Sequence, residues 1–459
     1  MAKYKAYPEY KKINSFWVNI IPSHWNYILF KRVVCDIKDG THGTHSRAEV
    51  GLPLLSAKNI QNYGIEINDD ESLISEREYR EITRNGFPQK NDLLITCVGT
   101  IGRSCVYPFI EPIAFQRSVA FLRLSTNASP YFYKYYVESK PYQCQLEATS
   151  KTSAQSGVYM GDLVNTLTVF PTTHEQVVIA EFLDHETAKI DNLIEKQQQL
   201  IELLKEKRQA VISHAVTKGL NPDVPMKDSG VEWLGEVPEH WDVKRIKHFG
   251  KVVGGFAFKS GDFTDEGYPV IKISNVSHLN FDWTDSSFLP HSFSVTNKEY
   301  LAPKGALIFA MTRPVIAGGI KVTLLDNDSA PLVNQRVGFM VVKQEDISRY
   351  ILISTQSSSF LAQFVNNMTI TNQPNISSEG IESIYLPVPP VNELSSILKY
   401  LDNLEGSYSD LIDKASRQVS LLQERRTALI SAAVTGKIDV RDWVAPNACE
   451  AEVSQEVTA

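Results

Sequence analysis

The sequence contains one long segment twice, and this repeat limits the possible folds more than any other feature. Trp17 and Trp25 recur as Trp233 and Trp241 at a constant offset of 216 residues, and the second tryptophan of each pair ends a Pro-x-His-Trp segment. A unit of this length is large enough to form at least one domain of its own. The chain is therefore predicted to consist of two related halves.

The two halves agree best near the end of each repeat. Residues 192–217 align with residues 410–435 at an offset of 218, and both segments end in Ile-Ser-x-Ala-Val-Thr. The centres agree much less, although Gln116-Arg117 has a counterpart in Gln335-Arg336 after a drift of a few residues in the offset. A duplication whose ends were kept while its centres diverged explains this pattern.

The first ~155 residues of each half mix short apolar runs with turn residues. Residues 92–98, 119–124 and 337–342 are rich in β-branched and aromatic side chains and predict strands. Residues 131–136 and 348–353 are more typical of short helices. Each half is therefore predicted to hold an α/β or α+β globular domain with many loops.

Each half ends in a predicted long helix. Apolar residues step by three and four along it, which is the pattern of a coiled-coil seam, and several seam positions are polar. Pro171 and Pro389 precede the two helices, and Gly219 and Gly436 follow them. We expect the two helices to pair with each other, antiparallel if a pseudo-two-fold relates the halves; two unconnected surface helices are the alternative. The proposed seam and partner positions are Leu193, Leu200, Leu204, Val211, Leu411, Leu422 and Leu429.

These features suggest five segments. The boundaries are 1–174 for the first globular domain, 175–220 for the first helical region, 221–392 for the second globular domain, 393–437 for the second helical region, and 438–459 for an acidic tail. The ~26 repeated helical residues would form a rod of about 39 Å. That length is close to one turn of B-DNA, about 34–36 Å.

Composition excludes several classes of protein. The sequence has no apolar stretch of membrane-spanning length and no secretion signal at its start, so we expect no membrane association. Its five cysteines form no CxxC pair, which favours a reducing cytoplasm over a disulfide framework or a zinc site. The formal net charge of −7 argues mildly against a tight, non-specific nucleic-acid binder.

No catalytic motif is evident. The single Pro-Pro, in Val388-Pro-Pro-Val391, lacks the amide and aromatic residues that hold a flipped adenine in a methyltransferase, and no phosphate-binding GxxxxGK[ST] loop occurs. Gly99 and Gly102 lack the context of a dinucleotide-binding turn. His42 and His45 form an HxxH, which we interpret as loop residues and not as metal ligands. We therefore expect no enzyme activity, cofactor or metal on this chain.

Several motifs resemble a known family. The segment 227–241, which runs from Lys-Asp-Ser-Gly to Pro-Glu-His-Trp, is similar to the opening of a target-recognition domain in type I restriction-modification specificity subunits. Asp39-Gly-Thr-His42 and Phe258-Lys-Ser260 resemble the starts of that family's variable regions, and the two helix ends at 208–217 and 426–435 resemble its repeated regions. The resemblance covers nearly the whole chain, although the first opening, at 12–17, lacks the Asp-Ser-Gly.

The resemblance implies a function. In this family each globular domain recognises one half of a split target on double-stranded DNA, and the helices act as a ruler and dock two methyltransferase subunits. The partners carry the chemistry: S-adenosylmethionine-dependent adenine methylation, and ATP- and Mg-dependent cleavage by a restriction subunit. The remaining alternative is a coiled-coil adaptor that carries two protein-binding modules and does not bind DNA.

Residues that contact DNA should be Arg, Lys, Asn, Gln, Ser, Thr or His on loops of the divergent centres. Positions shared by the halves suit phosphate contacts or structure, whereas unshared ones such as Arg103 or Arg313 suit bases. Trp25 and Trp241 are assigned to the core. The candidates are Thr41, His42, Thr44, Lys58, Arg103, Gln116, Arg117, Lys151 and Gln155 in the first half, and Lys259, Ser260, Lys272, Asn275, Arg313, Lys321, Gln335, Arg336 and Gln373 in the second.

Overall fold

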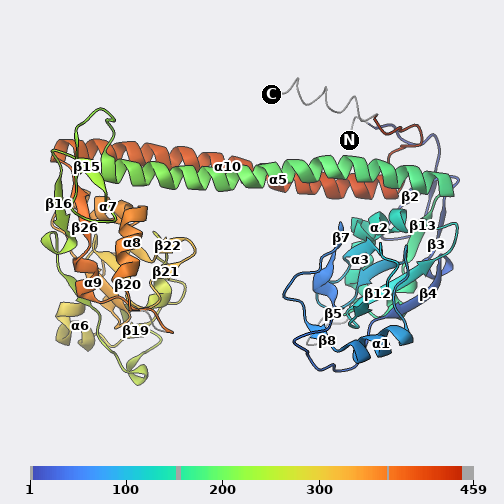
Figure 1. Ribbon diagram of the computed structural model, residues 1–459, viewed down its shortest axis with the longest axis horizontal. Coiled ribbons are helices and arrows are strands. Elements are labelled where there is room, and N and C mark those ends of the chain that lie inside the picture. The colour runs from blue at the N-terminus through green and yellow to red at the C-terminus, as the bar shows by residue number, and fades with distance from the viewer. Residues whose placement is uncertain (1–3, 151–156, 370–371, 447–459) are drawn as a thin grey trace. The chain divides into compact units, whose positions relative to one another are not determined.

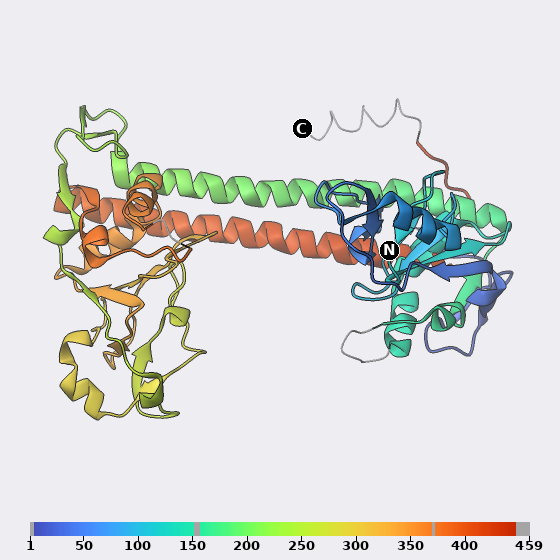
Figure 2. The same cartoon turned by 60° about the horizontal axis from the view of Figure 1, so that its bottom comes forward.

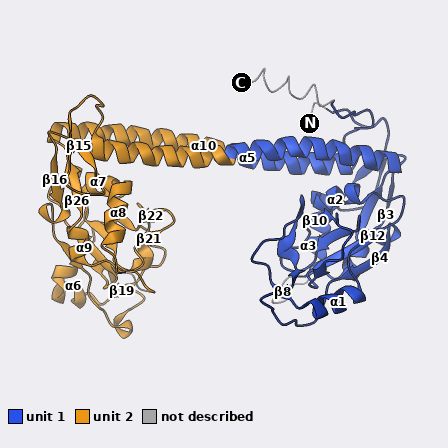
Figure 3. Ribbon diagram, viewed as in Figure 1, with its two compact units in different colours: residues 1–197, 417–459 blue, residues 198–416 orange. Residues whose placement is uncertain are grey.

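The computed structural model describes residues 4–150, 157–369 and 372–446. The chain divides into two compact units, which are described separately here (Figure 3). Unit 1 comprises residues 1–197 and 417–459, and unit 2 comprises residues 198–416. Each long helix is thus shared between the two units. The candidates Lys151 and Gln155 lie outside the described residues.

A four-stranded antiparallel sheet forms the centre of unit 1. Its order is β10-β9-β12-β4, and every residue of β9 is buried because both faces of this strand are covered. The strand predicted at 119–124 is β12, and the strand predicted at 92–98 is the shorter β9. The bounds are β4 Val34–Asp39, β9 Leu93–Thr96, β10 Ser104–Val106 and β12 Val119–Leu124.

A second sheet of three strands, in the order β11-β5-β8, lies beside it in unit 1; β11 runs parallel to β5. The short helix predicted at 131–136 is α2, whose N-terminus is capped by the Ser129 side chain. The bounds are β5 Leu52–Leu55, β8 Leu73–Ile74, β11 Ala114–Phe115, α1 Glu76–Asn85, α2 Pro130–Glu138, α3 Lys140–Thr149 and α4 Met160–Val164. The smaller pairs are β1 Tyr10–Lys12 with β2 Ile20–Pro22, β3 Asn26–Leu29 with β13 Leu167–Phe170, and β6 Ile60–Gln61 with β7 Gly64–Ile65.

Unit 2 repeats the strand order of both main sheets (Figure 1), but among the described residues its short pair β21-β22 has no strand counterpart in unit 1 and β6-β7 has none in unit 2. Its four-stranded sheet has the order β17-β25-β20-β23, and its three-stranded sheet has the order β19-β18-β24 with β24 parallel to β18. The bounds are β17 Val252–Gly254, β18 Tyr268–Ile271, β19 Phe288–Leu289, β20 Leu307–Ala310, β23 Val322–Leu324, β24 Leu332–Val333, β25 Val337–Met340, α6 Ser292–Thr296, α7 Glu345–Ser354, α8 Ser358–Asn366 and α9 Ser378–Glu382. The smaller pairs are β14 Met226–Asp228 with β15 Glu236–Pro238, β16 Asp242–Arg245 with β26 Tyr385–Val388, and β21 Val315–Ile316 with β22 Gly319–Ile320. The duplication is therefore one of fold, and the predicted α/β class is confirmed.

The two predicted long helices are α5 (Thr173–Lys218) and α10 (Val391–Val434). In unit 1, Arg426 of α10 pairs with Asp191 of α5 at 2.8 Å; in unit 2, Arg208 of α5 pairs with Glu405 of α10 at 3.0 Å. Apolar residues 212–216 of α5 share the core of unit 2 with residues 394–401 of α10. As the residue number increases along α5, the number of the contacting residue on α10 decreases. The two helices are therefore antiparallel within each unit, as Figures 1 and 2 show. The predicted pairing is confirmed.

Glycine ends each long helix, as predicted. Gly219 and Gly436 have φ values of +79° and +71°, a left-handed conformation that glycine adopts without a steric penalty. At Gly436 a Cβ would also lie 2.4 Å from the Pro22 ring, so no other residue fits there without displacing this ring.

Part of the predicted helix seam is wrong. Leu193, Leu200 and Leu411 are 48%, 42% and 48% exposed, so they point away from the packed face. The half-buried positions include Ile194, Ile201 and Ile412, each one residue further along. Both helices carry apolar residues next to each other at these points, so counting in threes and fours could not tell the packed face from the free one. Leu204, Val211, Leu422 and Leu429 do lie on the half-buried face.

One polar cluster fixes each globular domain to its long helix. In unit 1 the Trp25 Nε1 donates to Glu175 Oε1 at 3.0 Å, and His24 Nε2 lies 2.8 Å from the same oxygen. Glu175 sits in the first turn of α5. In unit 2 Trp241, His240 and Glu393 repeat the arrangement at 2.8 and 2.9 Å. Both tryptophans of the repeated Pro-x-His-Trp are fully buried, as predicted.

Candidate nucleic-acid interface

Loops at one edge of the central sheet of unit 1 are joined by backbone hydrogen bonds. Arg117 N donates to Thr41 O at 3.0 Å, Cys97 N donates to Ser118 O at 2.8 Å, and Val158 N donates to Cys97 O at 2.9 Å. The segment after β4, the β9–β10 loop, the β11–β12 turn and the segment before α4 therefore meet here. A rigid sheet edge that carries several loops is a common base for a binding surface.

The corresponding edge of unit 2 is joined by the same bonds. Gln335 N donates to Phe256 O at 2.9 Å, Met311 N donates to Arg336 O at 2.8 Å, and Ile376 N donates to Met311 O at 2.9 Å. Both units use a glycine where two backbones come close. A Cβ on Gly40 would lie 2.1 Å from Phe115 O, and a Cβ on Gly255 would lie 2.3 Å from Asn334 O. We call these two equivalent surfaces the loop edges of units 1 and 2.

Most of the described candidates in unit 1 belong to its loop edge. Thr41 is half-buried, and its Oγ1 lies 2.8 Å from His45 Nε2. His42 is exposed and contacts Asp39 at 2.7 Å. Thr44 and Arg117 are exposed, whereas Arg103 and Gln116 are half-buried.

Lys58 lies away from this edge, in the single turn Ala57–Asn59, where its ammonium group pairs with the buried Glu71 carboxylate at 2.8 Å. Burial opposes the charge of Glu71, but hydrogen bonds from Lys58 and Asn59 outweigh it and lower the pKa of this carboxyl. Lys58 thus has a structural task that competes with DNA contact.

In unit 2, Lys259, Ser260, Arg313, Gln335, Arg336 and Gln373 are exposed on or next to the loop edge, and Lys321 is half-buried there. Lys272 instead pairs with Asp285, with Nζ 3.0 Å from Oδ1.

The structure corrects one candidate. Asn275 is fully buried: its amide donates to the backbone oxygens of Asp282 and Asp285, and its Oδ1 accepts from Lys272 N at 2.7 Å. With all of its hydrogen-bonding groups used inside the unit, it cannot reach a base. Asn59, its repeat counterpart, is buried in the same way and accepts from Ser56 N at 2.9 Å. A buried turn-forming asparagine and a DNA-contacting one share the same residue type, so the sequence does not distinguish them.

Strand register also changes two repeat alignments. Because β11 and β24 occupy the same place in their sheets, Gln116 corresponds to Asn334 and Arg117 to Gln335, so the two Gln-Arg pairs are one residue out of step. Thr96 N donates to Arg103 O at 2.9 Å, and Ala310 N donates to Lys321 O at 3.0 Å, so Arg103 and Lys321 correspond. Arg103 is therefore a shared basic position and not an unshared one.

A second surface, which the sequence did not suggest, also occurs in both units. In unit 1 a groove of about 1010 Å³ lies between α10, the start of α3 and the opening segment, with Trp17, Lys140, Ala428 and Ser431 among its lining residues; Phe16 beside it is 99% exposed. In unit 2 a groove of about 600 Å³ is lined by the counterparts Trp233, Ser358, Ala210 and Ser213. We call these the helix grooves of units 1 and 2.

The described residues contain no group of three His, Cys, Asp or Glu side chains that could hold a metal ion. His42 and His45 are instead held by Asp39 and Thr41. Within the described part of the chain, no helix is long and apolar enough to cross a membrane. The features that remain are two loop edges with basic and amide side chains, and two helix grooves.

Comparison with known proteins identifies a family. The family model for the type I restriction modification DNA specificity domain matches residues 49–203 and 238–420. The chain is similar to the MjaVIII specificity subunit of Methanocaldococcus jannaschii (28% identity over 59% of this chain and 62% of the relative) and to the EcoAI specificity subunit of Escherichia coli (24% over 52% and 41%). These two matches thus span less than two thirds of the relatives' own length.

Two further similarities cover more of the chain. The EcoKI specificity subunit of Escherichia coli K12 is 24% identical over 86% of this chain and 84% of its own length. A solved chain from a study of complex assembly and conformational transition in a type I R-M system has a TM-score of 0.67 and 13% identity, and the match covers 91% of this chain and 99% of that chain. The structural likeness supports the fold alone.

Proposed function

Since the chain belongs to the family of type I restriction-modification DNA specificity proteins, we propose that it selects the DNA sequence on which a methyltransferase and restriction complex acts. The chain itself performs no chemistry. S-adenosylmethionine is bound by methyltransferase subunits, and ATP and Mg by restriction subunits, so all three belong to the partners. The complex works on double-stranded DNA in the cytoplasm. A coiled-coil adaptor that does not bind DNA is not favoured by this family.

We assign one half of a bipartite target to each loop edge. The observation that carries this proposal is that two units of one topology present different exposed side chains at equivalent places of their loop edges, for example Arg117 in unit 1 where unit 2 has Gln335. Equivalent positions that are basic in both units, Arg103 and Lys321, suit phosphate oxygens, which are the same at every sequence. Positions that differ suit base edges. We keep 1–174 and 221–392 as the two target-recognition domains.

A footprint of the assembled complex tests this assignment. Two protected half-sites with an unprotected gap, and binding that weakens steeply as salt rises, are the expected results, because Lys and Arg contacts to phosphates release counterions. One contiguous protected site would contradict the two-edge assignment. Binding to DNA that does not depend on sequence would contradict the proposed function as a whole.

We further assign the two helix grooves to the two methyltransferase subunits. The grooves occur once per unit and are lined by residues from the most similar parts of the repeat, as expected if one identical partner docks twice. Each combines an aromatic rim, the half-buried Trp17 or the exposed Trp233, with a small residue on the helix, Ala428 or Ala210. An apolar rim and a small-residue floor suit a protein surface that packs closely, and aromatic residues are enriched at such interfaces.

Filling one groove at a time tests the docking sites. Ala428→Arg should remove one of two bound methyltransferase subunits, and Ala210→Arg the other, because a long charged side chain would occupy the space of the partner. The double variant should bind neither. Ser409→Arg, at an exposed helix position outside both grooves, is the matched control and should leave two subunits bound. Mass measurement of the assembled complex gives the stoichiometry, and two bound subunits in the double variant would contradict the assignment.

A further inference from the structure

Arg313 occupies a backbone position that favours glycine. Met311 of unit 2 and Cys97 of unit 1 are equivalent, because their backbones make the same two hydrogen bonds. The N of Met311 donates to the β24–β25 turn and its O accepts from the segment before α9; the N of Cys97 donates to the β11–β12 turn and its O accepts from the segment before α4. Two residues further along, Arg313 of unit 2 therefore corresponds to Gly99 of unit 1. Both have positive φ, +43° and +82°. Glycine adopts this conformation freely, whereas an arginine there is strained.

The surrounding structure holds Arg313 in this conformation. Its N donates to Pro374 O at 2.8 Å, and Lys321 N donates to Pro314 O at 2.7 Å, so the chain is fixed on both sides. Pro314 itself favours an extended conformation for the residue before it, which makes the positive φ of Arg313 still less favourable. Among the described residues, four that are not glycine have positive φ, and Arg313 is the charged one of them. Strain of this kind tends to occur where a side chain has a function.

The Arg313 side chain is available to a ligand. It is exposed, and within the described residues it makes no hydrogen bond or ion pair that would hold it in the unit. Its neighbours on the loop edge of unit 2 are the exposed Gln335 and Arg336, and Met311 N bonds the turn that carries them. In unit 1 the corresponding Gly99 has open space where a Cβ would stand. At this position, unit 2 therefore presents an exposed arginine side chain, and unit 1 presents none.

We propose that Arg313 reads a guanine in the half-site bound by unit 2, and that unit 1 makes no side-chain contact from the equivalent position. This inference rests on the proposed function. The guanidinium presents paired N–H donors that match the O6 and N7 acceptors of guanine in the major groove, a pairing no other base offers. A contact with phosphate would not require this position to differ between the units, and the shared pair Arg103 and Lys321 already suits that task.

The test compares the complex reconstituted with its methyltransferase subunits, carrying either the wild-type chain or Arg313→Gly. Methylated sites are mapped over a genome-sized DNA, and binding is measured on duplexes in which each base pair is changed in turn. Arg313→Gly should abolish the requirement for one G·C pair in one half-site, with a loss of about 5- to 150-fold in discrimination there. The other half-site should be unchanged. An unchanged pair of half-sites, or a change in the half-site of unit 1, would overturn the inference.

Two further variants separate recognition from charge and from folding. Lys321→Gln removes one positive charge from the same edge and should weaken binding to all sequences alike, with a smaller salt dependence and no change in the recognised sequence. Arg313→Gly should unfold at the same temperature as wild type or a higher one, because glycine relieves the strained φ. A lower unfolding temperature, or an identical sequence change in Lys321→Gln, would contradict a base contact by Arg313.

Failure of this inference can be told from failure of the proposed function. If the wild-type complex shows no bipartite sequence, the proposed function is wrong. If it shows one and Arg313→Gly shows the same one, the proposed function stands and Arg313 does not read a base.

Discussion

Glu175 and Glu138 are both buried carboxylates of unit 1, and their surroundings shift their pKa values in opposite directions. Burial raises the pKa of Glu175, but hydrogen bonds from Trp25, Thr172 and His24 outweigh it, so the pKa lies below its ordinary value of 4.5. Burial also raises the pKa of Glu138, and the positive charges of Lys134 and Arg426 offset this only in part, so its pKa lies above 4.5. The contributions of these two side chains to the free energy of unfolding should therefore depend on pH in opposite directions.

Glu175→Gln should destabilise unit 1 by about 1–3 kcal/mol at pH 7, because the bonds to a charged acceptor become bonds to a neutral one. Since the folded pKa is depressed, the stability that wild type draws from Glu175 is fully present above about pH 4.5 and is lost as the pH falls through the folded pKa. Urea unfolding at several pH values measures this. Glu393→Gln changes the equivalent residue of unit 2 and is the control for unit specificity. A difference that grows on acidification would contradict the role of Glu175.

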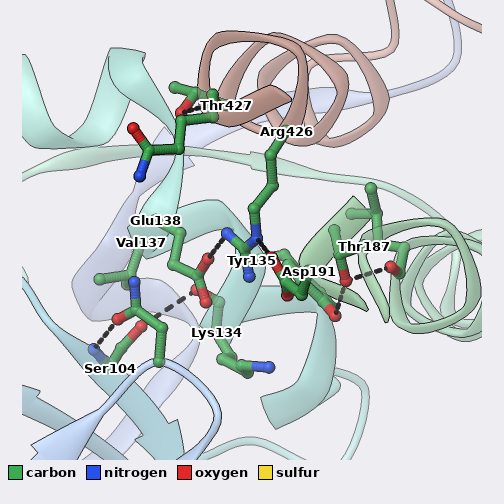
Figure 4. A network of polar contacts seen from close by, with 12 residues as sticks. Ser104, Lys134, Tyr135, Val137, Glu138, Thr187, Asp191, Arg426 and Thr427 are labelled. Carbon is green, nitrogen blue, oxygen red and sulfur yellow. Dashed lines mark hydrogen bonds and ion pairs between the residues drawn. The ribbon is translucent and has the colours of Figure 1, made fainter. Parts of the chain in front are cut away.

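Glu138→Gln should be close to neutral or stabilising at pH 7, within about 1 kcal/mol. Figure 4 shows Arg426 between Glu138 and Asp191; Glu138 Oε2 lies 3.0 Å from its guanidinium, and Oε1 has no partner among the described residues. Gln356 of unit 2 is the natural counterpart at this position. Because the folded pKa is raised, wild type should lose stability relative to the variant as the pH rises from about 4.5 through that pKa. Stability curves of both chains against pH test this, and a strong loss at pH 7 would contradict it.

At the scale of single residues, the sequence predicted burial better than contact. Trp25 and Trp241 could be assigned to the core, because a large apolar side chain has one favourable place. Asn275 could not be assigned, since a polar side chain is satisfied equally well by a buried turn and by DNA. The positive φ of Arg313 depends on hydrogen bonds from segments distant in the sequence, so no local pattern could predict it.

At the scale of elements, helix ends and sheet strands were predictable and the helix face was not. Gly219 and Gly436 mark ends that depend on local backbone conformation. The packed face of α5 and α10 depends on the partner helix, and neighbouring leucines and isoleucines satisfy two registers equally well. Residue type misleads in the same way at Gln116. It aligns Gln116 with Gln335, whereas strand pairing aligns Gln116 with Asn334, one residue earlier.

If the long helices set the distance between the two half-sites, lengthening both helices should lengthen the gap. Inserting seven residues into both α5 and α10 near residues 198 and 416 keeps the heptad phase and adds about 10.5 Å of helix. The gap between the two half-sites should lengthen by about three base pairs, at about 3.4 Å each, while the half-sites themselves stay the same. Methylation mapping gives the gap directly. An unchanged gap would show that the helices do not set the spacing.

At the scale of the whole molecule, the duplication was the most predictable feature. It also explains why some surfaces are proposed to bind protein partners and others to bind DNA. The similar parts of the halves form the long helices, the helix grooves and the buried Trp–His–Glu clusters. The dissimilar parts form the loop edges. Similarity between the halves therefore marks the surfaces proposed to meet identical partners, and dissimilarity marks those proposed to meet two different DNA sequences.

Replacing residues 221–392 by a second copy of residues 1–174 tests this division. The resulting chain should still bind two methyltransferase subunits. Its helices are kept, and the residues that residues 1–174 contribute to the unit 1 groove are present in both halves. Its recognised sequence should consist of two identical half-sites, both equal to the one that unit 1 reads in wild type. Persistence of the second wild-type half-site would place its recognition outside the exchanged domain.

Methylation mapping of DNA treated with the reconstituted wild-type complex tests the central claim most directly. The account predicts one recognised sequence made of two different short half-sites, each containing a methylated adenine, separated by a gap of fixed length and arbitrary bases. A single contiguous sequence, or methylation without sequence preference, would contradict it.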